Sequence, residues 1–201
     1  MTFNRIRSKI DKHLRSNPNG FWPGRSTTAH ILALRRLIDH EGVKSHNLKA
    51  FLVFTDFKKA FDSVHEGRML QILRAYDIPE KQIDAFGLLY QGTKARTPDG
   101  ETDFFKIQAG VLQGGTLAPY IFAIVLDYAM RRAIDGREEE LGFKVDRRRS
   151  RRHHPVVITD TDFADDIAIT TEEIHQTQEM LASVELEAAK SDFILIRRRR
   201  K

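Results

Sequence analysis

Three aspartates interrupt segments that are otherwise apolar and typical of β-strands. Asp56 lies within residues 51–57 (Phe-Leu-Val-Phe-Thr-Asp-Phe), and Asp165 and Asp166 lie within residues 163–169 (Phe-Ala-Asp-Asp-Ile-Ala-Ile). Aspartate is depleted in strands, and a buried carboxylate without a partner is costly. Adjacent carboxylates also raise each other's pKa, so ionised acids at these positions need a cation nearby. Oxygen ligands without histidine or cysteine favour Mg²⁺ or Mn²⁺.

These acids can serve one site only if the chain turns beside them. Neighbouring strand residues point to opposite faces, so Asp165 and Asp166 must lie at or beside a hairpin turn, where aspartate tolerates left-handed backbone angles. Each segment alone also fits a simpler interpretation, in which Asp56 ends its strand and the pair forms a solvated turn. A calcium loop beginning at Asp160 is excluded, because Asp165 would stand where glycine is needed and Thr171 where glutamate is needed.

The first half of the chain predicts a helix, a strand and two further helices. Ser26 or Thr27 can cap the first helix, and a buried strand over residues 50–57 carries Asp56. One later helix surrounds residues 69–76, and Pro79 opens the next. Residues 98–100 (Pro-Asp-Gly) form a turn between short extended stretches. The expected apolar positions are Ile31, Leu34 and Ile38 in the first helix and Ile83, Phe86, Leu88 and Leu89 in the last.

The second half predicts a core helix, a hairpin and a final helix. Thr116 and Pro119 begin a helix that is apolar on nearly all sides and ends near Gly136. Strands over residues 156–158 and 167–169 would meet around the aspartate pair. Thr170 and Glu173 would form a capping box for a helix that buries Ile174, Leu181, Val184 and Ala188. This order of elements predicts an α+β fold with an antiparallel sheet backed by helices.

Composition fits a folded protein of one large domain or two small ones. The 201 residues are 41% apolar and 30% charged, as in ordinary globular proteins. The absence of cysteine excludes disulfides, thiolate zinc sites and a cysteine nucleophile. No apolar run reaches the roughly 20 residues that cross a bilayer, and residues 1–15 lack the apolar core of a signal peptide. We therefore expect an intracellular protein, cytoplasmic or nuclear, with no membrane partner.

Positive charge is concentrated in two places. The net charge is +5, and residues 197–201 supply five positive charges. A second cluster covers residues 147–152 and continues into His153 and His154, which have no spaced partner for a zinc site. Such clusters usually decorate a solvated loop, although they can also face phosphates.

Four segments, in order, resemble the reverse transcriptase domain of non-LTR (LINE-type) retrotransposons. They are residues 20–28 (Gly-Phe-Trp-Pro-Gly-Arg-Ser-Thr-Thr), 54–64 (Phe-Thr-Asp-Phe-Lys-Lys-Ala-Phe-Asp-Ser-Val), 109–119 (Ala-Gly-Val-Leu-Gln-Gly-Gly-Thr-Leu-Ala-Pro) and 163–166 (Phe-Ala-Asp-Asp). The resemblance covers roughly residues 4–190. It implies a partial fingers segment over residues 1–49, a polymerase palm over residues 50–196 and a basic tail over residues 197–201, with no thumb.

The family's chemistry would supply the cation that the acids require. By this resemblance, Asp56, Asp165 and Asp166 hold two Mg²⁺ or Mn²⁺ ions, and the backbone carbonyl of Phe57 is a further ligand. The implied reaction is RNA-directed DNA synthesis, a nucleotidyl transfer that adds dNTPs to the 3′-hydroxyl of a DNA primer on an RNA template.

Other residues match substrate-binding positions of the family. Phe61 matches an aromatic gate that would exclude a ribose 2′-hydroxyl, Gln113 and Gly114 match a pair that lies against the incoming nucleotide, and Arg25 would touch template or phosphate. From the residues alone, Phe61 fits a core aromatic, the pair fits an ordinary turn, and Arg25 fits a solvated residue near a helix start.

Asp62, Asp160 and Asp162 could be additional metal ligands. Surface or strand-edge roles fit them better, because aspartate is mostly an exposed residue.

The sequence also departs from the family pattern. Trp22 stands where the family commonly has arginine, and Gly115 where close relatives carry an acid. No counterpart of the upstream basic fingers motif precedes Asn4, and the usual continuation into a thumb is missing after Lys190. These features indicate a truncated or frame-slipped copy. They leave a second hypothesis open, an inactive remnant that binds nucleic acid, whereas RNA-templated RNA synthesis is disfavoured by Phe61.

Overall fold

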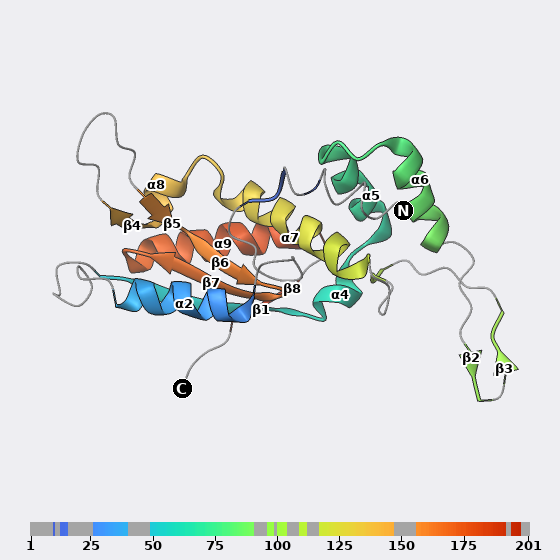
Figure 1. Cartoon of the computed structure of the whole chain (residues 1–201), viewed down its shortest axis with the longest axis horizontal. Helices are drawn as coiled ribbons and strands as arrows, with labels where there is room; N and C mark the ends of the chain where they lie inside the picture. The colour runs from blue at the N-terminus through green and yellow to red at the C-terminus, as the bar shows by residue number, and fades with distance from the viewer. Residues whose placement is uncertain are drawn as a thin grey trace.

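The protein is described here by a computed structural model. The described residues are 10, 13–15, 26–39, 49–90, 96–98, 100–103, 109–111, 117–146, 156–191 and 194–197. They form a mixed fold of helices and antiparallel strands (Figure 1), which confirms the predicted α+β class. Within these residues, no helix is both long enough and apolar enough to cross a bilayer.

A four-stranded antiparallel sheet lies at the centre of the fold. Its strand order is β6 (Asp160–Phe163), β7 (Asp166–Thr171), β1 (Phe51–Lys58) and β8 (Ile194–Arg197). The predicted strand around Asp56 is therefore confirmed as β1. Its residues alternate in burial near the acid, with Thr55 and Phe57 buried and Phe54 exposed, as expected for a strand whose two faces meet different surroundings.

Our prediction that residues 156–158 form the hairpin partner of β7 was wrong. Residues 156–158 form β5 (Val156–Ile158), which pairs with β4 (Phe143–Asp146) in a separate ribbon. The hairpin partner of β7 is instead the polar segment Asp-Thr-Asp-Phe of β6. A pattern of apolar residues could not find this strand, because Asp160 and Asp162 are paired with a residue far away in the sequence, described below.

Helices cover both faces of the sheet (Figure 1). The long α7 (Ala118–Ile134) and α9 (Ile174–Ala189) pack together on one face, while α2 (Thr27–Ile38) lies against β6. Beyond α7 lie α5 (Glu66–Ala75) and α6 (Glu80–Tyr90), and the short α4 (Ala60–Ser63) follows β1. The remaining short elements are α8 (Glu138–Leu141), β2 (Arg96–Thr97) and β3 (Gly100–Glu101).

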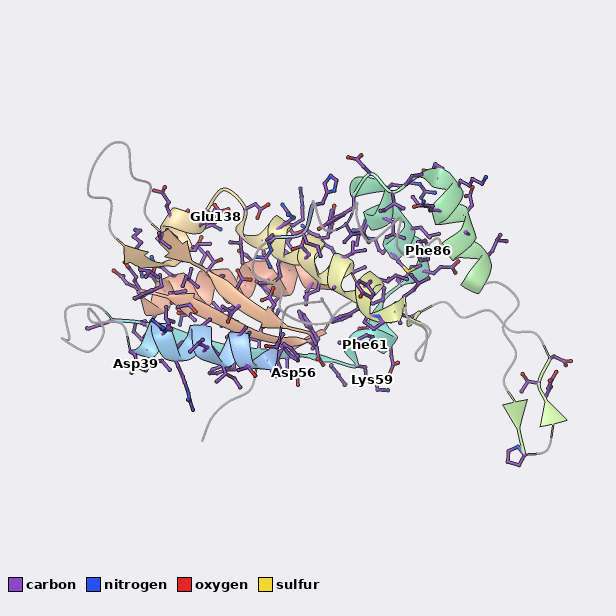
Figure 2. The ribbon with its side chains drawn as sticks, in the orientation of Figure 1. Asp39, Asp56, Lys59, Phe61, Phe86 and Glu138 are labelled. Carbon is purple, nitrogen blue, oxygen red and sulfur yellow. The ribbon has the colours of Figure 1, made fainter. Side chains whose placement is uncertain are left out.

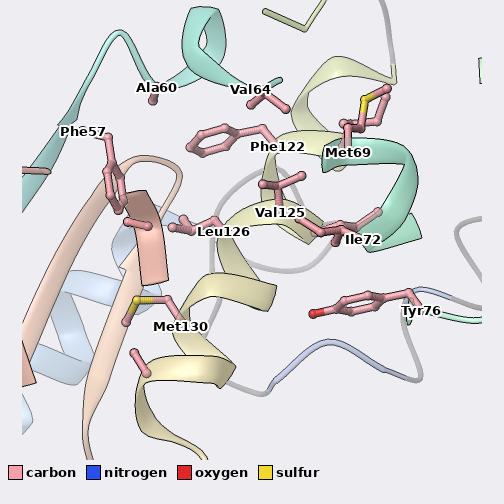
Figure 3. Packing of buried hydrophobic residues seen from close by; sticks show 14 of the residues in the cluster. Phe57, Ala60, Val64, Met69, Ile72, Tyr76, Phe122, Val125, Leu126 and Met130 are labelled. Atoms are coloured by element: carbon pink, nitrogen blue, oxygen red, sulfur yellow. The ribbon is translucent and has the colours of Figure 1, made fainter. Parts of the chain in front are cut away.

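The core is built around α7, as its apolar sequence predicted. Proline stands in its first turn, where the missing N–H costs nothing. Phe122 and Met130 of this helix have no exposed surface, and Phe122 lies among side chains from β1, α4 and α5 (Figure 3). Asp127 is only 1% exposed in the same helix. A charged residue at such a position needs partners, and these are described below.

Some helix faces and caps differ from expectation. Ser26 caps α2 by accepting a hydrogen bond from the backbone of Ala29 at 3.3 Å, as predicted, but Ile31 and Ile38 are 51% and 53% exposed. The helix buries His30 and Leu37 instead.

The final helix, α9, begins later along the chain than expected, because its N-cap is Glu173 rather than Thr170. Its capping box is formed by Glu173 with Gln176, because Thr170 is buried inside β7. Leu181, Val184 and Ala188 are buried as predicted, whereas Ile174 at the start of the helix is exposed. In α6, Ile83 and Phe86 are buried as predicted and Leu88 is exposed.

Candidate active site

The hairpin between β6 and β7 carries Asp165 in its turn. Phe163 pairs with Asp166, so the connecting loop consists of Ala164 and Asp165 alone. Ala164 has a left-handed backbone with φ of 56°. We expected this conformation at an aspartate of the pair, but Ala164, just before Asp165, adopts it. Asp165 is half-buried and Asp166 is exposed. Both acids therefore lie at one end of the sheet, where a ligand from solvent can reach them.

The register of β1 brings Asp56 to the same end of the sheet. Thr55 pairs with Ile167, and continuing this antiparallel register by one residue puts Asp56 opposite Asp166. Side chains directly opposite each other share a face, with β-carbons about 4.5–5.5 Å apart. Asp56 is half-buried rather than fully buried, and it lies near the end of β1 just before the chain enters α4 (Figure 2). Two acidic motifs far apart in the sequence are thus adjacent in the sheet.

The chain beyond β1 brings the glycine-containing segment close to Phe61. The backbone N–H of Val111 donates to the carbonyl of Phe61 at 2.8 Å, and that of Gly110 donates to Val64 at 2.8 Å. The ring of Phe61 stacks on Phe122, with centroids 4.5 Å apart and planes inclined by 22°. This packing is that of a core aromatic, and a gating role for Phe61 stays a prediction.

The remaining candidate residues are placed as follows. The side chain of Phe57 is 3% exposed and belongs to the core, so only its backbone could face a ligand. Arg25, Gln113 and Gly114 lie outside the described residues. Asp62 is exposed, as expected.

A cavity of about 550 Å³ adjoins Asp166 on the side of the sheet that α2 covers. Its lining combines β1, the hairpin and α2: Thr27, His30, Ile31, Leu34, Leu52, Val53, Phe54, Phe163 and Asp166. The His30 ring meets Phe163 edge to face at 6.4 Å. Burial lowers the pKa of His30, and the charge of Asp166 acts in the opposite direction. His30 is therefore a neutral neighbour of the acidic end of the sheet at pH 7.

The three acids suit a hard divalent cation in their chemistry. They offer carboxylate oxygens at an accessible end of the sheet. In the described part of the chain, no group of three or more His, Cys, Asp or Glu side chains forms a metal site by itself. Mg²⁺ usually binds through one or two carboxylates, with water and substrate phosphates completing its shell. The residues present fit that mode of binding.

A second group of acids, which sequence reasoning missed, lies on the opposite face of β6. We expected surface or strand-edge roles for Asp160 and Asp162. They do lie on an edge strand, but they are only 1% and 2% exposed. Both face Arg15, which also contacts Asp127 of α7. The available signal was an aspartate inside the largely apolar α7, together with two acids at alternate positions of a strand.

Arg15 uses each nitrogen of its guanidinium on a different carboxylate. Nε lies 3.2 Å from Oδ1 of Asp127, Nη1 lies 3.0 Å from Oδ1 of Asp160, and Nη2 lies 3.0 Å from Oδ2 of Asp162. Burial opposes the charge on Arg15, but the three carboxylates outweigh this and raise its pKa. Tyr76 and Arg131 bind the second oxygen of Asp127, at 2.6 and 2.9 Å.

The buried cluster is electrically neutral only if it holds a proton. Two arginines, Arg15 and Arg131, face the three buried carboxylates. Burial, and then the charge of Asp160, raise the pKa of Asp162 well above its usual range. A proton on Asp162 would be shared with Asp160 through their hydrogen bond. We define Arg15, Asp127, Asp160 and Asp162 as the Arg15 cluster.

Comparison with known proteins agrees with the resemblance read from the motifs. A family model described as "Reverse transcriptase (RNA-dependent DNA polymerase)" matches residues 1–197. The chain is 30% identical over 130 residues to the Retrovirus-related Pol polyprotein from type-2 retrotransposable element R2DM of Drosophila melanogaster. It is 28% identical over 137 residues to that from type-1 retrotransposable element R2 of Nasonia vitripennis.

These alignments include 63% and 67% of this chain but only 12% of each polyprotein. The chain therefore spans a small part of the length of its curated relatives.

Solved structures share the fold. Telomerase from Candida tropicalis, in complex with a fragment of telomeric RNA, superimposes with a TM-score of 0.70 at 12% identity, covering 96% of this chain and 32% of that one. Telomerase from Candida albicans gives a TM-score of 0.64 at 12% identity, covering 98% of this chain and 34% of that one. At this identity the likeness concerns the fold, and it supports the predicted polymerase palm.

The family model covers nearly the whole chain, and the fold and the adjacent acidic motifs agree with it. This chain belongs to the reverse transcriptase (RNA-dependent DNA polymerase) family.

Proposed function

We propose that this domain copies RNA into DNA, adding dNTPs to the 3′-hydroxyl of a DNA primer at the end of the sheet where Asp56, Asp165 and Asp166 lie. The observation that carries the proposal is the register of the sheet, in which Thr55, next to Asp56, pairs with Ile167, next to Asp166. Family membership supports the same reaction. The partners would be an RNA template, a DNA primer and dNTPs.

The three carboxylates would hold two divalent cations, Mg²⁺ or Mn²⁺. When bound, these cations would acidify the primer hydroxyl and neutralise the triphosphate and its leaving pyrophosphate. Asp56 and Asp165 are half-buried, so their positions are held by the surrounding sheet while their oxygens stay accessible. Asp166 is exposed beside them and would add negative charge that retains the cations near the substrate.

The other described residues would position the substrates. Phe61 is fixed by its stacking on Phe122, and a ring held rigidly can exclude a ribose hydroxyl by steric contact. The segment that leads to Gln113 and Gly114 begins at the hydrogen bond from Val111 to Phe61. We propose that this pair, and Arg25, contact the incoming nucleotide and template as the family motifs imply.

Primer extension on an RNA template tests the proposal. The wild-type domain should incorporate dNTPs with Mg²⁺ or Mn²⁺, and Asp56→Ala and Asp165→Asn should each lose nearly all incorporation. Asp84→Asn is the matched control, because Asp84 is an exposed acid on α6, far from the hairpin, and should leave incorporation unchanged.

Two outcomes of the primer-extension assay would contradict the proposal. If the wild-type domain is folded and binds primer–template but incorporates no dNTP, the polymerase proposal is wrong for this chain and the nucleic-acid-binding remnant remains. If Asp165→Asn retains full incorporation, the reaction does not use the proposed acids.

A further inference from the structure

One of the two strands of the hairpin that carries the proposed active-site acids is β6, the edge strand of the described sheet. Within the described sheet, β6 is hydrogen-bonded only to β7, so no other described strand holds its outer side. Two of its four residues are aspartates, which pack poorly in strands. Besides its pairing with β7, the position of β6 therefore depends on what its side chains contact across the face of the sheet.

The Arg15 cluster supplies that contact. Asp160 and Asp162 alternate along β6, so both point toward α7, where Asp127 lies. Arg15 bridges the two elements, and its side chain is 9% exposed against 3% or less for the three acids. The backbone N–H of Arg15 also donates to Asp127 at 3.1 Å. The segment around Arg15 is thereby attached to α7 at two points.

The arrangement of the three carboxylates requires the planar guanidinium of an arginine rather than the single ammonium group of a lysine. Three nitrogens of one guanidinium reach three carboxylates at 3.0–3.2 Å. A lysine ammonium carries the same charge but has no fixed fork with which to bind three separated acids at once. Removing the arginine would leave buried carboxylates facing one another, and this repulsion would push β6 away from α7.

Displacement of β6 would reach the active site directly. Asp162 lies next to Phe163, and only Ala164 and Asp165 separate Phe163 from its partner Asp166. A two-residue loop has little slack, so a shift of the strand moves the turn as well. Active-site geometry is sensitive to such shifts, since a displacement of about 1 Å can cost about 100-fold in rate.

We propose that Arg15 is a positioning residue of the active site: by clamping β6 to α7, it holds the hairpin that carries Asp165 and Asp166. This inference rests on the proposed function, since it assigns Arg15 a role in the same reaction. Arg15 acts through the strand and does not itself touch the substrates.

The test compares Arg15→Lys and Arg15→Met with a control that is destabilised elsewhere. Ile83→Ala removes a fully buried side chain of α6, away from the hairpin. Amide hydrogen exchange over residues 163–167 measures hairpin opening without any need for activity. Steady-state primer extension, at a temperature where circular dichroism shows every variant folded, gives kcat and the KM for dNTP.

Both Arg15 variants should exchange the hairpin amides about tenfold faster or more and lose about tenfold or more in kcat, with a smaller change in KM. Ile83→Ala should leave hairpin exchange and kcat within about twofold of the wild type, because its cavity lies in a different part of the core. Arg15→Lys should behave more like Arg15→Met than like the wild type, since charge alone does not restore the fork.

The outcomes separate the two proposals. A folded Arg15→Lys with wild-type kcat, or with wild-type hairpin exchange, overturns the positioning role. Faster exchange with unchanged kcat overturns it equally, because Arg15 would then be structural only. If the wild type itself incorporates nothing, the proposed function fails, and the exchange data alone decide whether Arg15 holds the hairpin. Should both Arg15 variants fail to fold, Asp160→Asn weakens one β6 contact and must show the same two effects to a smaller degree.

Discussion

Two substitutions of equal size within the Arg15 cluster should have very different effects on stability. Asp127→Asn and Asp162→Asn each replace one carboxylate oxygen by an amide group, without changing the shape of the side chain. What differs is the number of donors that already face each acid. The cluster therefore allows charge and hydrogen-bond satisfaction to be tested while packing is held constant.

Asp127 accepts four hydrogen bonds and has no place for an N–H. Its Oδ1 accepts from the backbone and Nε of Arg15 at 3.1 and 3.2 Å, and its Oδ2 accepts from Tyr76 and Arg131 at 2.6 and 2.9 Å. If asparagine places its NH₂ group where either oxygen was, this group faces the donors that bound that oxygen. Two hydrogen bonds to the charged carboxylate are then lost, each worth about 1.5–3 kcal/mol. We expect Asp127→Asn to lose about 3–5 kcal/mol of the free energy of unfolding, out of the roughly 5–15 kcal/mol typical of a domain.

Asp162 should tolerate the same change at pH 7. Burial and the charge of Asp160 raise the pKa of Asp162, which favours a protonated side chain. The amide of asparagine can donate in place of that proton while its oxygen still accepts from Arg15. We expect the free energy of unfolding of Asp162→Asn to lie within about 1 kcal/mol of the wild type.

The pH dependence of stability has a definite sign at Asp162. Because its pKa is higher in the folded than in the unfolded state, the folded protein binds more protons between the two values. This contribution to stability is fully present below the unfolded pKa of about 3.9, and it is lost as pH rises through the folded pKa, with a slope of up to about 1.4 kcal/mol per pH unit. Asp162→Asn should remove that slope.

Urea denaturation at a series of pH values measures both effects. The reasoning is refuted if Asp162→Asn is as damaging as Asp127→Asn at pH 7, or if it retains the wild-type decline of stability with pH.

Three further outcomes are expected. Gly142→Ala should lower the free energy of unfolding by about 1–3 kcal/mol in urea denaturation, because its new Cβ would approach the backbone oxygen of Glu138 to 2.8 Å and also meet Val157; an unchanged midpoint would contradict this packing. Phe61→Val should raise rNTP incorporation relative to dNTP incorporation in primer extension, and an unchanged ratio would remove the gating role. Nucleic-acid affinity should fall steeply with salt if the two arginine clusters contact phosphates, and a flat response in fluorescence anisotropy would exclude them.

Local patterns predicted most of the helices and the strand β1. The largely apolar α7 and the capped α2 follow directly from side-chain periodicity and from Ser26. The failures share one physical cause, which is that a neighbour distant in the sequence changes what a residue can do. The strand β6 was missed because its aspartates are paired with Arg15, and no pattern in its own residues announces that partner.

The candidate site was predictable to a similar extent. Acids inside apolar strands indicated that something unusual must compensate them, and the motifs indicated which of them belong together. Sequence could not supply the register that pairs Thr55 with Ile167 and so brings Asp56 near the hairpin, since strand pairing depends on the whole sheet. It also could not tell that Asp127, Asp160 and Asp162 would be deeply buried, with Arg15 and Arg131 as their cations.

The central claim is that Asp56 and Asp165 serve the same cation, and Mn²⁺ binding tests it most directly. Paramagnetic resonance titration of the wild type, Asp56→Asn, Asp165→Asn and the double variant yields a double-mutant cycle for the metal affinity. If one ion contacts both carboxylates, each single variant should weaken binding strongly, and the double variant should be weakened by clearly less than the sum of the two. Purely additive losses, or single variants that bind Mn²⁺ as the wild type does, would contradict the claim.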